Sequence, residues 1–131
     1  MIVLDTHALV WWLAEPARLS IRARRTIQDA ARDFSLVASA ISLFEIATAV
    51  RRRRLVLSVP VGQWLSDLLQ LPELRVEPVA AGIAELAGSF DESIPGDPAD
   101  RIIAATALVL KSTLVTADER LRRTPALVTV W

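Results

Sequence analysis

Short apolar runs alternate with longer segments of helical composition along this sequence. The short runs are bounded by turn-forming residues, which predicts buried strands at residues 2–4, 34–38, 75–79, 113–116 and 127–130. The longer segments predict helices over residues 8–14, 20–32 with Ser20 as N-cap, 42–51, 61–71, 81–90, 98–111 and the stretch "DERLRR", whereas the apolar segment 55–59 stays ambiguous.

The alternation of strands and helices predicts a parallel sheet with helices on both faces, which is an α/β fold. No repeat, low-complexity tract or linker interrupts the 131 residues. We therefore expect residues 1–131 to form a single domain.

Composition narrows the possible chemistry. The chain is 53% hydrophobic, yet no run of about 18 uncharged apolar residues predicts a membrane span, and residues 1–5 carry no basic n-region of a secretory signal. These features predict a cytoplasmic protein without membrane contact.

The residue types present limit the possible metal ligands and partners. The chain has no cysteine and His7 is its only histidine, so a metal ion would need oxygen ligands. The net charge is zero, so binding of nucleic acid would require a local basic patch.

Acidic residues gather where the predicted strands end. Asp5 follows the first strand, Glu45 lies early in the helix after the second, and Asp118 follows the strand "TLVT". Because the carboxyl ends of parallel strands lie along one edge of a sheet, these carboxylates are predicted on one rim. Asp100 begins the long helix after a loop, and the strand pattern does not place it.

Each acid also has a capping interpretation. "SLFE" at 42–45 has the form of a capping box for Glu45, "DPAD" at 97–100 places Asp97 as an N-cap, and Asp118 is suited to cap the helix that follows it. Capping itself would bring the acids to a common edge, where clustered carboxylates repel one another unless a cation neutralises them. Magnesium or manganese would match such oxygen ligands and would suit phosphoryl chemistry.

Four motifs in this order and spacing resemble the PIN-domain family, in particular the VapC-like ribonuclease toxins of toxin–antitoxin modules. They are "IVLDTHALVWW", "SLFEIA", "DPADRIIAATA" and "LVTADERL", and the resemblance covers essentially the whole chain. It implies a three-layer α/β/α sandwich with a mainly parallel sheet. It also implies a Mg²⁺- or Mn²⁺-dependent endoribonuclease, an RNA substrate, a cognate antitoxin and a homodimer.

The resemblance also implies roles for individual residues. The catalytic acids would be Asp5, Glu45, Asp100 and Asp118; the metal ligands among them would be Asp5, Asp100 and Asp118, with Glu45 orienting or deprotonating the attacking, metal-activated water. Attack at phosphorus would leave a 5′-phosphate and a 3′-hydroxyl. Thr6, Thr116 and Arg101 are expected at the substrate-binding surface, where the two threonines orient a carboxylate or a water.

Several features keep two interpretations. The arginines at 51–54 suit either a solvated helix end or a track for RNA phosphates. Trp11, Trp12 and Phe44 are interpreted most simply as core, with a protein interface as the alternative. Two rival functions remain. One is a haloacid dehalogenase-like phosphatase, which would need a second acid two residues after Asp5, where this sequence has His7. The other is a protein-binding module without catalytic activity.

Overall fold

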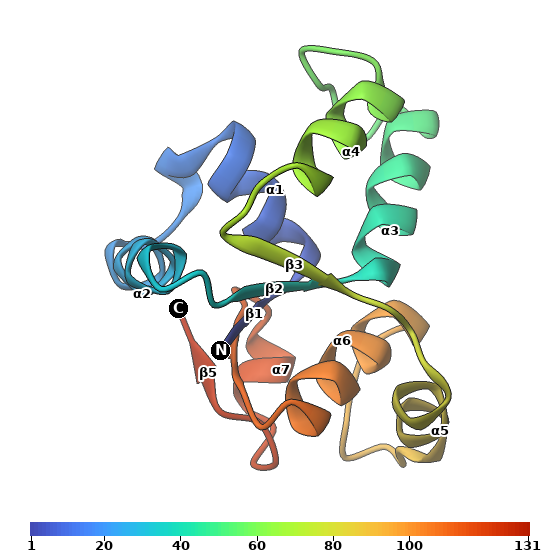
Figure 1. Ribbon diagram of the computed structural model, residues 1–131. Coiled ribbons are helices and arrows are strands. Elements are labelled where there is room, and N and C mark those ends of the chain that lie inside the picture. Colours follow the sequence, from blue (N-terminus) through green and yellow to red (C-terminus); the bar gives the residue numbers. More distant parts are fainter.

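Five short strands pair in parallel, in the order β3-β2-β1-β4-β5, in the computed structural model of the chain, which describes all residues 1–131 (Figure 1). The strands are β1 (Ile2–Leu4), β2 (Leu36–Ser39), β3 (Leu74–Glu77), β4 (Thr113–Val115) and β5 (Thr129–Val130). The helices are α1 (Thr6–Ala14), α2 (Ile21–Arg32), α3 (Ala40–Arg51), α4 (Val61–Leu69), α5 (Ala81–Ser89), α6 (Pro98–Val109) and α7 (Glu119–Arg122), with a 3₁₀ turn at Pro16–Arg18.

Helices cover both faces of the sheet, as Figure 1 shows. Successive strand residues point to opposite faces, so neighbouring residues join different cores. Leu4 packs into the core formed with α1, α2, α3 and α4, whereas Val3 packs into the core formed with α6 and α7. The three central strands β1, β2 and β4 are therefore buried on both sides, which explains their apolar sequences, whereas the edge strands β3 and β5 are only partly buried.

The strand register sets the position of the site. Leu4 of the central strand pairs with Ala38 on one side and with Val115 on the other. The chain leaves these three paired residues at the same edge of the sheet, and Asp5 is the residue that follows Leu4. Its backbone amide still donates to the Val115 carbonyl oxygen at 3.1 Å. The first aspartate is thus fixed at the carboxyl edge of the middle strand.

The predicted α/β class, the parallel sheet and the helices on both faces are confirmed. The element boundaries differ where local backbone chemistry decides them. The second strand begins at Leu36 because Phe34 adopts a left-handed conformation, with φ of 53°, at the end of α2. Residues 55–59 form neither helix nor strand. No helix is long and apolar enough to cross a lipid bilayer.

Candidate active site

A groove of about 1130 Å³ runs along the carboxyl edge of the sheet, between α1, α3 and the amino ends of α6 and α7. Six acids line it. They are the four predicted acids, Asp5, Glu45, Asp100 and Asp118, together with Asp97 and Glu15. The fold therefore brings Asp100, which the strand pattern did not place, to the same groove as the other acids.

Asp5 is buried at the floor of the groove, with 7% of its surface exposed. It is the N-cap of α1, and its Oδ1 accepts a hydrogen bond from the Ala8 amide at 2.8 Å. Burial raises the pKa of the Asp5 carboxyl, and the nearby charge of Asp118 raises it further, whereas hydrogen bonds from Thr116 and Ala8 oppose the shift. The buried carboxylate is held in place by these donors but is only partly compensated by them.

Thr116 is fully buried between two of the acids. Its Oγ1 accepts a hydrogen bond from the Asp118 amide at 3.1 Å. The same hydroxyl lowers the pKa of Asp5, so it favours the charged form of that carboxyl. Thr116 does not line the groove and serves as a support beneath it.

Glu45 projects from α3 and is held by a residue of α1. The Thr6 hydroxyl donates to Glu45 Oε1 and also hydrogen-bonds to the buried Ser42 hydroxyl at 2.8 Å. The predicted capping box is wrong, because α3 begins at Ala40 with Ser39 as its N-cap, and Ser42 lies inside the helix. Burial raises the pKa of Glu45, the charges of Asp97 and Asp5 add to the shift, and Thr6 lowers it.

Asp100 lies in the first turn of α6. Asp97 caps this helix as predicted, accepting from the Asp100 amide at 2.9 Å, and Pro98 follows it at the first helical position. Burial raises the pKa of Asp100 to about 6, with further contributions from the charges of Asp97, Glu45 and Asp118. Asp100 is thus coupled electrostatically to the cap of its own helix, to Glu45 of α3 and to the cap of α7.

Asp118 caps α7, as predicted. Its Oδ1 accepts from the amides of Arg120 and Leu121 at 2.8 and 3.4 Å, and its Oδ2 lies 3.5 Å from the Arg120 guanidinium. The Asp118 side chain is 29% exposed and lines the groove, so the carboxylate is accessible from the groove as well as capping the helix. Asp118 therefore both caps α7 and lines the groove, so its two interpretations are compatible.

The donor set of the groove fits a hard divalent cation. Only oxygen ligands are present near the acids apart from His7. Burial, and then the repulsion of the neighbouring carboxylates, raises the pKa of Asp100, and a bound cation would oppose both effects. No three of the His, Asp and Glu side chains come close enough to hold one ion together. Magnesium usually keeps several waters and binds through one or two carboxylates, so the open arrangement suits a hydrated ion.

Arg101 faces away from this groove. Its guanidinium donates to the carbonyl oxygens of Phe90 and Asp91 at 2.7 and 3.1 Å, which braces the loop before α6. It is not among the residues that line the groove, in contrast to Thr6. A contact between Arg101 and substrate stays a prediction, and it would require the guanidinium to leave these carbonyl oxygens.

Sequence reasoning missed two features of the site. Phe44, interpreted as core, is 65% exposed and lines the groove beside Glu45, so the core interpretation is wrong for this residue. Gly96 has a φ of 107°, and a Cβ built on it would lie 2.6 Å from the Cβ of Asp100. The glycine and prolines of the loop "DESIPGDPAD" were a visible signal for the second feature, whereas nothing in the sequence marked the first.

The α1 wall of the groove carries aromatic rings. His7 and Trp11 lie with ring centroids 5.5 Å apart, and the Arg18 guanidinium lies 5.0 Å from the Trp11 ring centroid. All three line the groove, with His7 exposed. Trp11 and Trp12 are half-buried and pack against the core, which agrees with the core interpretation.

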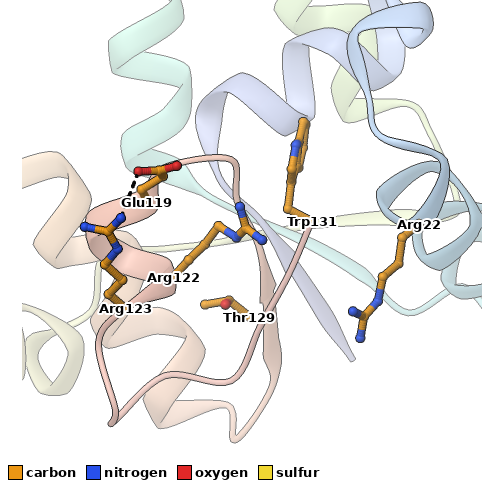
Figure 2. Close-up of a pocket in the computed structure, with 6 residues that line it drawn as sticks. All are labelled: Arg22, Glu119, Arg122, Arg123, Thr129 and Trp131. Atoms are coloured by element: carbon orange, nitrogen blue, oxygen red, sulfur yellow. Dashed lines mark hydrogen bonds and ion pairs between the residues drawn. The ribbon is translucent and has the colours of Figure 1, made fainter.

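A second, smaller hollow of about 320 Å³ lies on the other side of α7 (Figure 2). Figure 2 shows Arg22 from α2, Arg122 from α7 and Arg123 directly after that helix around it, together with Trp131. Its only carboxylate, Glu119, is paired with Arg123 at 3.3 Å. This hollow therefore does not offer the acid chemistry of the main groove.

The comparisons with known proteins agree with this geometry. The PIN domain model matches residues 2–127. The chain is also similar to Ribonuclease VapC22 of Mycobacterium tuberculosis, with 42% identity over 132 residues, 99% of this chain and 98% of that protein. The chain therefore belongs to the PIN-domain family and is a homologue of the VapC ribonucleases.

Solved structures of low identity share the fold. The crystal structure of VapBC2 from Rickettsia felis, bound to a DNA fragment from its promoter, matches with a TM-score of 0.70 and 21% identity, over 99% of this chain and 98% of that one. A toxin–antitoxin complex from Klebsiella pneumoniae matches with a TM-score of 0.66 and 17% identity, over 98% and 97% of the two chains. These matches show that the fold is shared over nearly the whole length of the chain.

Proposed function

We propose that this protein is a VapC-type ribonuclease toxin of a toxin–antitoxin module, a metal-dependent endoribonuclease built as one domain over residues 1–131. The observation that carries the proposal is the convergence of Asp5, Glu45, Asp100 and Asp118 on one groove of a PIN fold. The identity to Ribonuclease VapC22 over nearly the whole of both chains supports the activity and the substrate class. Family membership also argues against the haloacid dehalogenase-like phosphatase.

The resident cofactor would be Mg²⁺ or Mn²⁺, held by Asp5, Asp100 and Asp118, with no more than two of them as direct ligands and the rest acting through water. When bound, the ion supplies the positive charge that activates water, polarises the scissile phosphate and stabilises the transition state. The pKa of Asp100 would then fall from about 6, because a cation favours the charged carboxylate. Asp5, whose pKa is raised by burial, would be stabilised in its charged form in the same way.

Glu45 has the properties of a general base. Burial raises its pKa above the usual value of a glutamate, which makes the carboxylate a better proton acceptor than an ordinary glutamate. Thr6 holds Oε1, and Oε2 makes no hydrogen bond to the protein. Oε2 would accept the proton of the attacking water. Inline attack at phosphorus would break the bond between phosphorus and O3′, which leaves a 5′-phosphate on one fragment, and the departing O3′ would take a proton from solvent water to become a 3′-hydroxyl.

The partners follow from the same relatives. One structural neighbour is a toxin–antitoxin complex, which supports a cognate antitoxin for this chain, and the groove would be the surface that the antitoxin covers. An antitoxin arginine would pair with the acids of the groove, since a guanidinium binds carboxylates bidentately. We also propose a homodimer, which light scattering of the purified protein would test.

Cleavage of total bacterial RNA tests the proposed activity. Purified protein with Mg²⁺ or Mn²⁺ should give discrete fragments, and a chelator, Asp5→Asn or Asp100→Asn should abolish them. Asparagine is as good an N-cap as aspartate, so Asp5→Asn removes the charge without removing the cap of α1. A 2′,3′-cyclic phosphate at the new ends would contradict the proposed attack by water, and failure of folded, antitoxin-free protein to cleave any RNA would favour the catalytically silent module.

A further inference from the structure

The α3 wall of the groove exposes a large aromatic ring next to a predicted catalytic residue. Phe44 is 65% exposed and precedes Glu45, and both line the groove. Neither ring-to-ring contact nor core packing engages Phe44. Exposed rings of this kind mark binding surfaces when polar groups surround them.

The same wall continues into a row of unpaired positive charges. Arg51, Arg52 and Arg54 line the groove and are exposed, and none of them has a carboxylate within 4.0 Å. The other groove arginines differ, because Arg18 is paired with Glu15 and Arg120 with Asp118. The three free guanidinium groups therefore offer the groove its uncompensated positive charge.

The spacing along α3 separates the ring from the charges. Phe44 and Arg51 are seven residues apart, which is about 10 Å along a helix and nearly two full turns, so both lie on a similar face. A single small anion would not contact both positions. A chain that carries flat bases and regularly repeated phosphates would, because one base could lie on the ring while following phosphates meet the arginines.

From these contacts we infer that the α3 wall is a single-stranded RNA subsite, in which Phe44 stacks on a base beside the scissile phosphate and Arg51, Arg52 and Arg54 hold the backbone phosphates that lead away from it. This inference rests on the proposed ribonuclease function. A base can stack on a side chain only when it is free of its own neighbours, so the subsite selects unpaired RNA over duplex. RNA is favoured over an acidic peptide because the residue next to Phe44 is Glu45, and a ligand on the ring therefore lies beside the reacting phosphate.

Binding of RNA across a range of salt concentrations tests the subsite. All variants are made on Asp100→Asn, so that RNA stays intact, and a fluorescent single strand is compared with a duplex of the same sequence. Arg51→Gln with Arg52→Gln should reduce the slope of log K against log salt by about 1.4, or about 0.7 per lost phosphate contact. Phe44→Ala should weaken single-strand binding by about tenfold and leave duplex binding unchanged, and Phe44→Trp should restore it.

A matched control separates local contacts from overall charge. Arg25→Gln with Arg53→Gln removes two exposed arginines that do not line the groove, and it should leave the salt slope unchanged. Thermal melts would verify that every variant is folded. If the unsubstituted enzyme cleaves RNA, but the α3 variants bind RNA with the same affinity and salt slope as Asp100→Asn alone, the subsite is disproved and the proposed function stands. If the parent enzyme neither binds nor cleaves RNA, the proposed function fails first.

Discussion

The Thr6 hydroxyl donates to Glu45 across 39 positions of sequence, from the first turn of α1 to the middle of α3. The same hydroxyl is hydrogen-bonded to the buried Ser42. Because Thr6 has one proton and gives it to Glu45, Ser42 must donate to Thr6. The relay Ser42 to Thr6 to Glu45 thus fixes the direction of each proton and joins the two helices that flank the groove.

Removal of the relay should impair the general base. In Thr6→Val the pKa of Glu45 should rise further, because the hydrogen bond that lowers it is lost. We expect RNA cleavage at pH 7 to fall by about tenfold and the acidic limb of its pH profile to move to higher pH. The buried Ser42 would lose its partner, so the free energy of unfolding should fall by about 1 to 3 kcal/mol.

Thr6→Ser is the matched control for this prediction, since it keeps the hydroxyl. Its pH profile should coincide with that of the parent protein. A Thr6→Val enzyme with a parental pH profile would show that Glu45 is not the titrating base.

Gly96 is needed for the position of Asp100. Alanine at this position would place its Cβ 2.6 Å from the Asp100 Cβ and 2.8 Å from Oδ2, in a backbone conformation that non-glycine residues rarely adopt. Gly96→Ala should therefore lower cleavage by at least about tenfold and destabilise the fold by about 1 to 3 kcal/mol. Activity assays and chemical denaturation would measure the two effects.

Gly88→Ala is the control for Gly96→Ala, because the same change of glycine to alanine should here increase stability and leave activity unchanged. Gly88 lies in α5 with no atom within 4 Å of the added Cβ, so alanine should stabilise the helix by about 0.5 to 1 kcal/mol. Its activity should not change. Equal activity of the Gly96 and Gly88 variants would refute the proposed role of the tight approach to Asp100.

The fold was predictable because it depends on patterns that are local in sequence. The apolar strand at residues 2–4 and the cap at Asp97 can each be predicted from a pattern of only a few neighbouring residues. The positions of Asp5 and Asp118 followed from the rule that parallel strands end at one edge. These steps use only the order of the elements and the period of the side chains.

The contacts between distant elements were not predictable in this way. The short-range pattern at 42–45 indicated a capping box. In the structure the helix starts earlier, at Ala40, and Glu45 accepts a hydrogen bond from Thr6 of another helix instead of capping α3. Phe44 is apolar and lies two residues before the core residue Ile46, yet it points to the other side of the helix and is exposed. Arg101 lies within a family motif, but only the loop conformation shows that two carbonyl oxygens occupy its guanidinium.

The raised pKa of Asp100 predicts an inverse dependence of stability on pH. The folded protein binds the proton with a pKa of about 6, above the ordinary value of 3.8, so stability falls as pH rises from about 4 to above 6. In chelator, Asp100→Asn should be more stable than the parent protein at pH 8, by about 1 kcal/mol once solvent screening is allowed for, and the difference should vanish near pH 4. Denaturation curves at both pH values would measure it, and a parent protein that is the more stable one at pH 8 would contradict the repulsion among the acids.

Divalent ions should stabilise the folded protein through these same acids. An ion that binds only the folded state adds about 1.4 kcal/mol to the free energy of unfolding at ten times its Kd, so Mg²⁺ or Mn²⁺ should raise the Tm and a chelator should reverse the effect. Asp5→Asn keeps the N-cap but lacks the buried charge, and it should lose most of the response. Asp29→Asn, which neutralises an exposed aspartate on α2, should respond like the parent protein. Ions that stabilise Asp5→Asn as strongly as the parent protein would show that they bind outside the groove, because the missing charge lies at its floor.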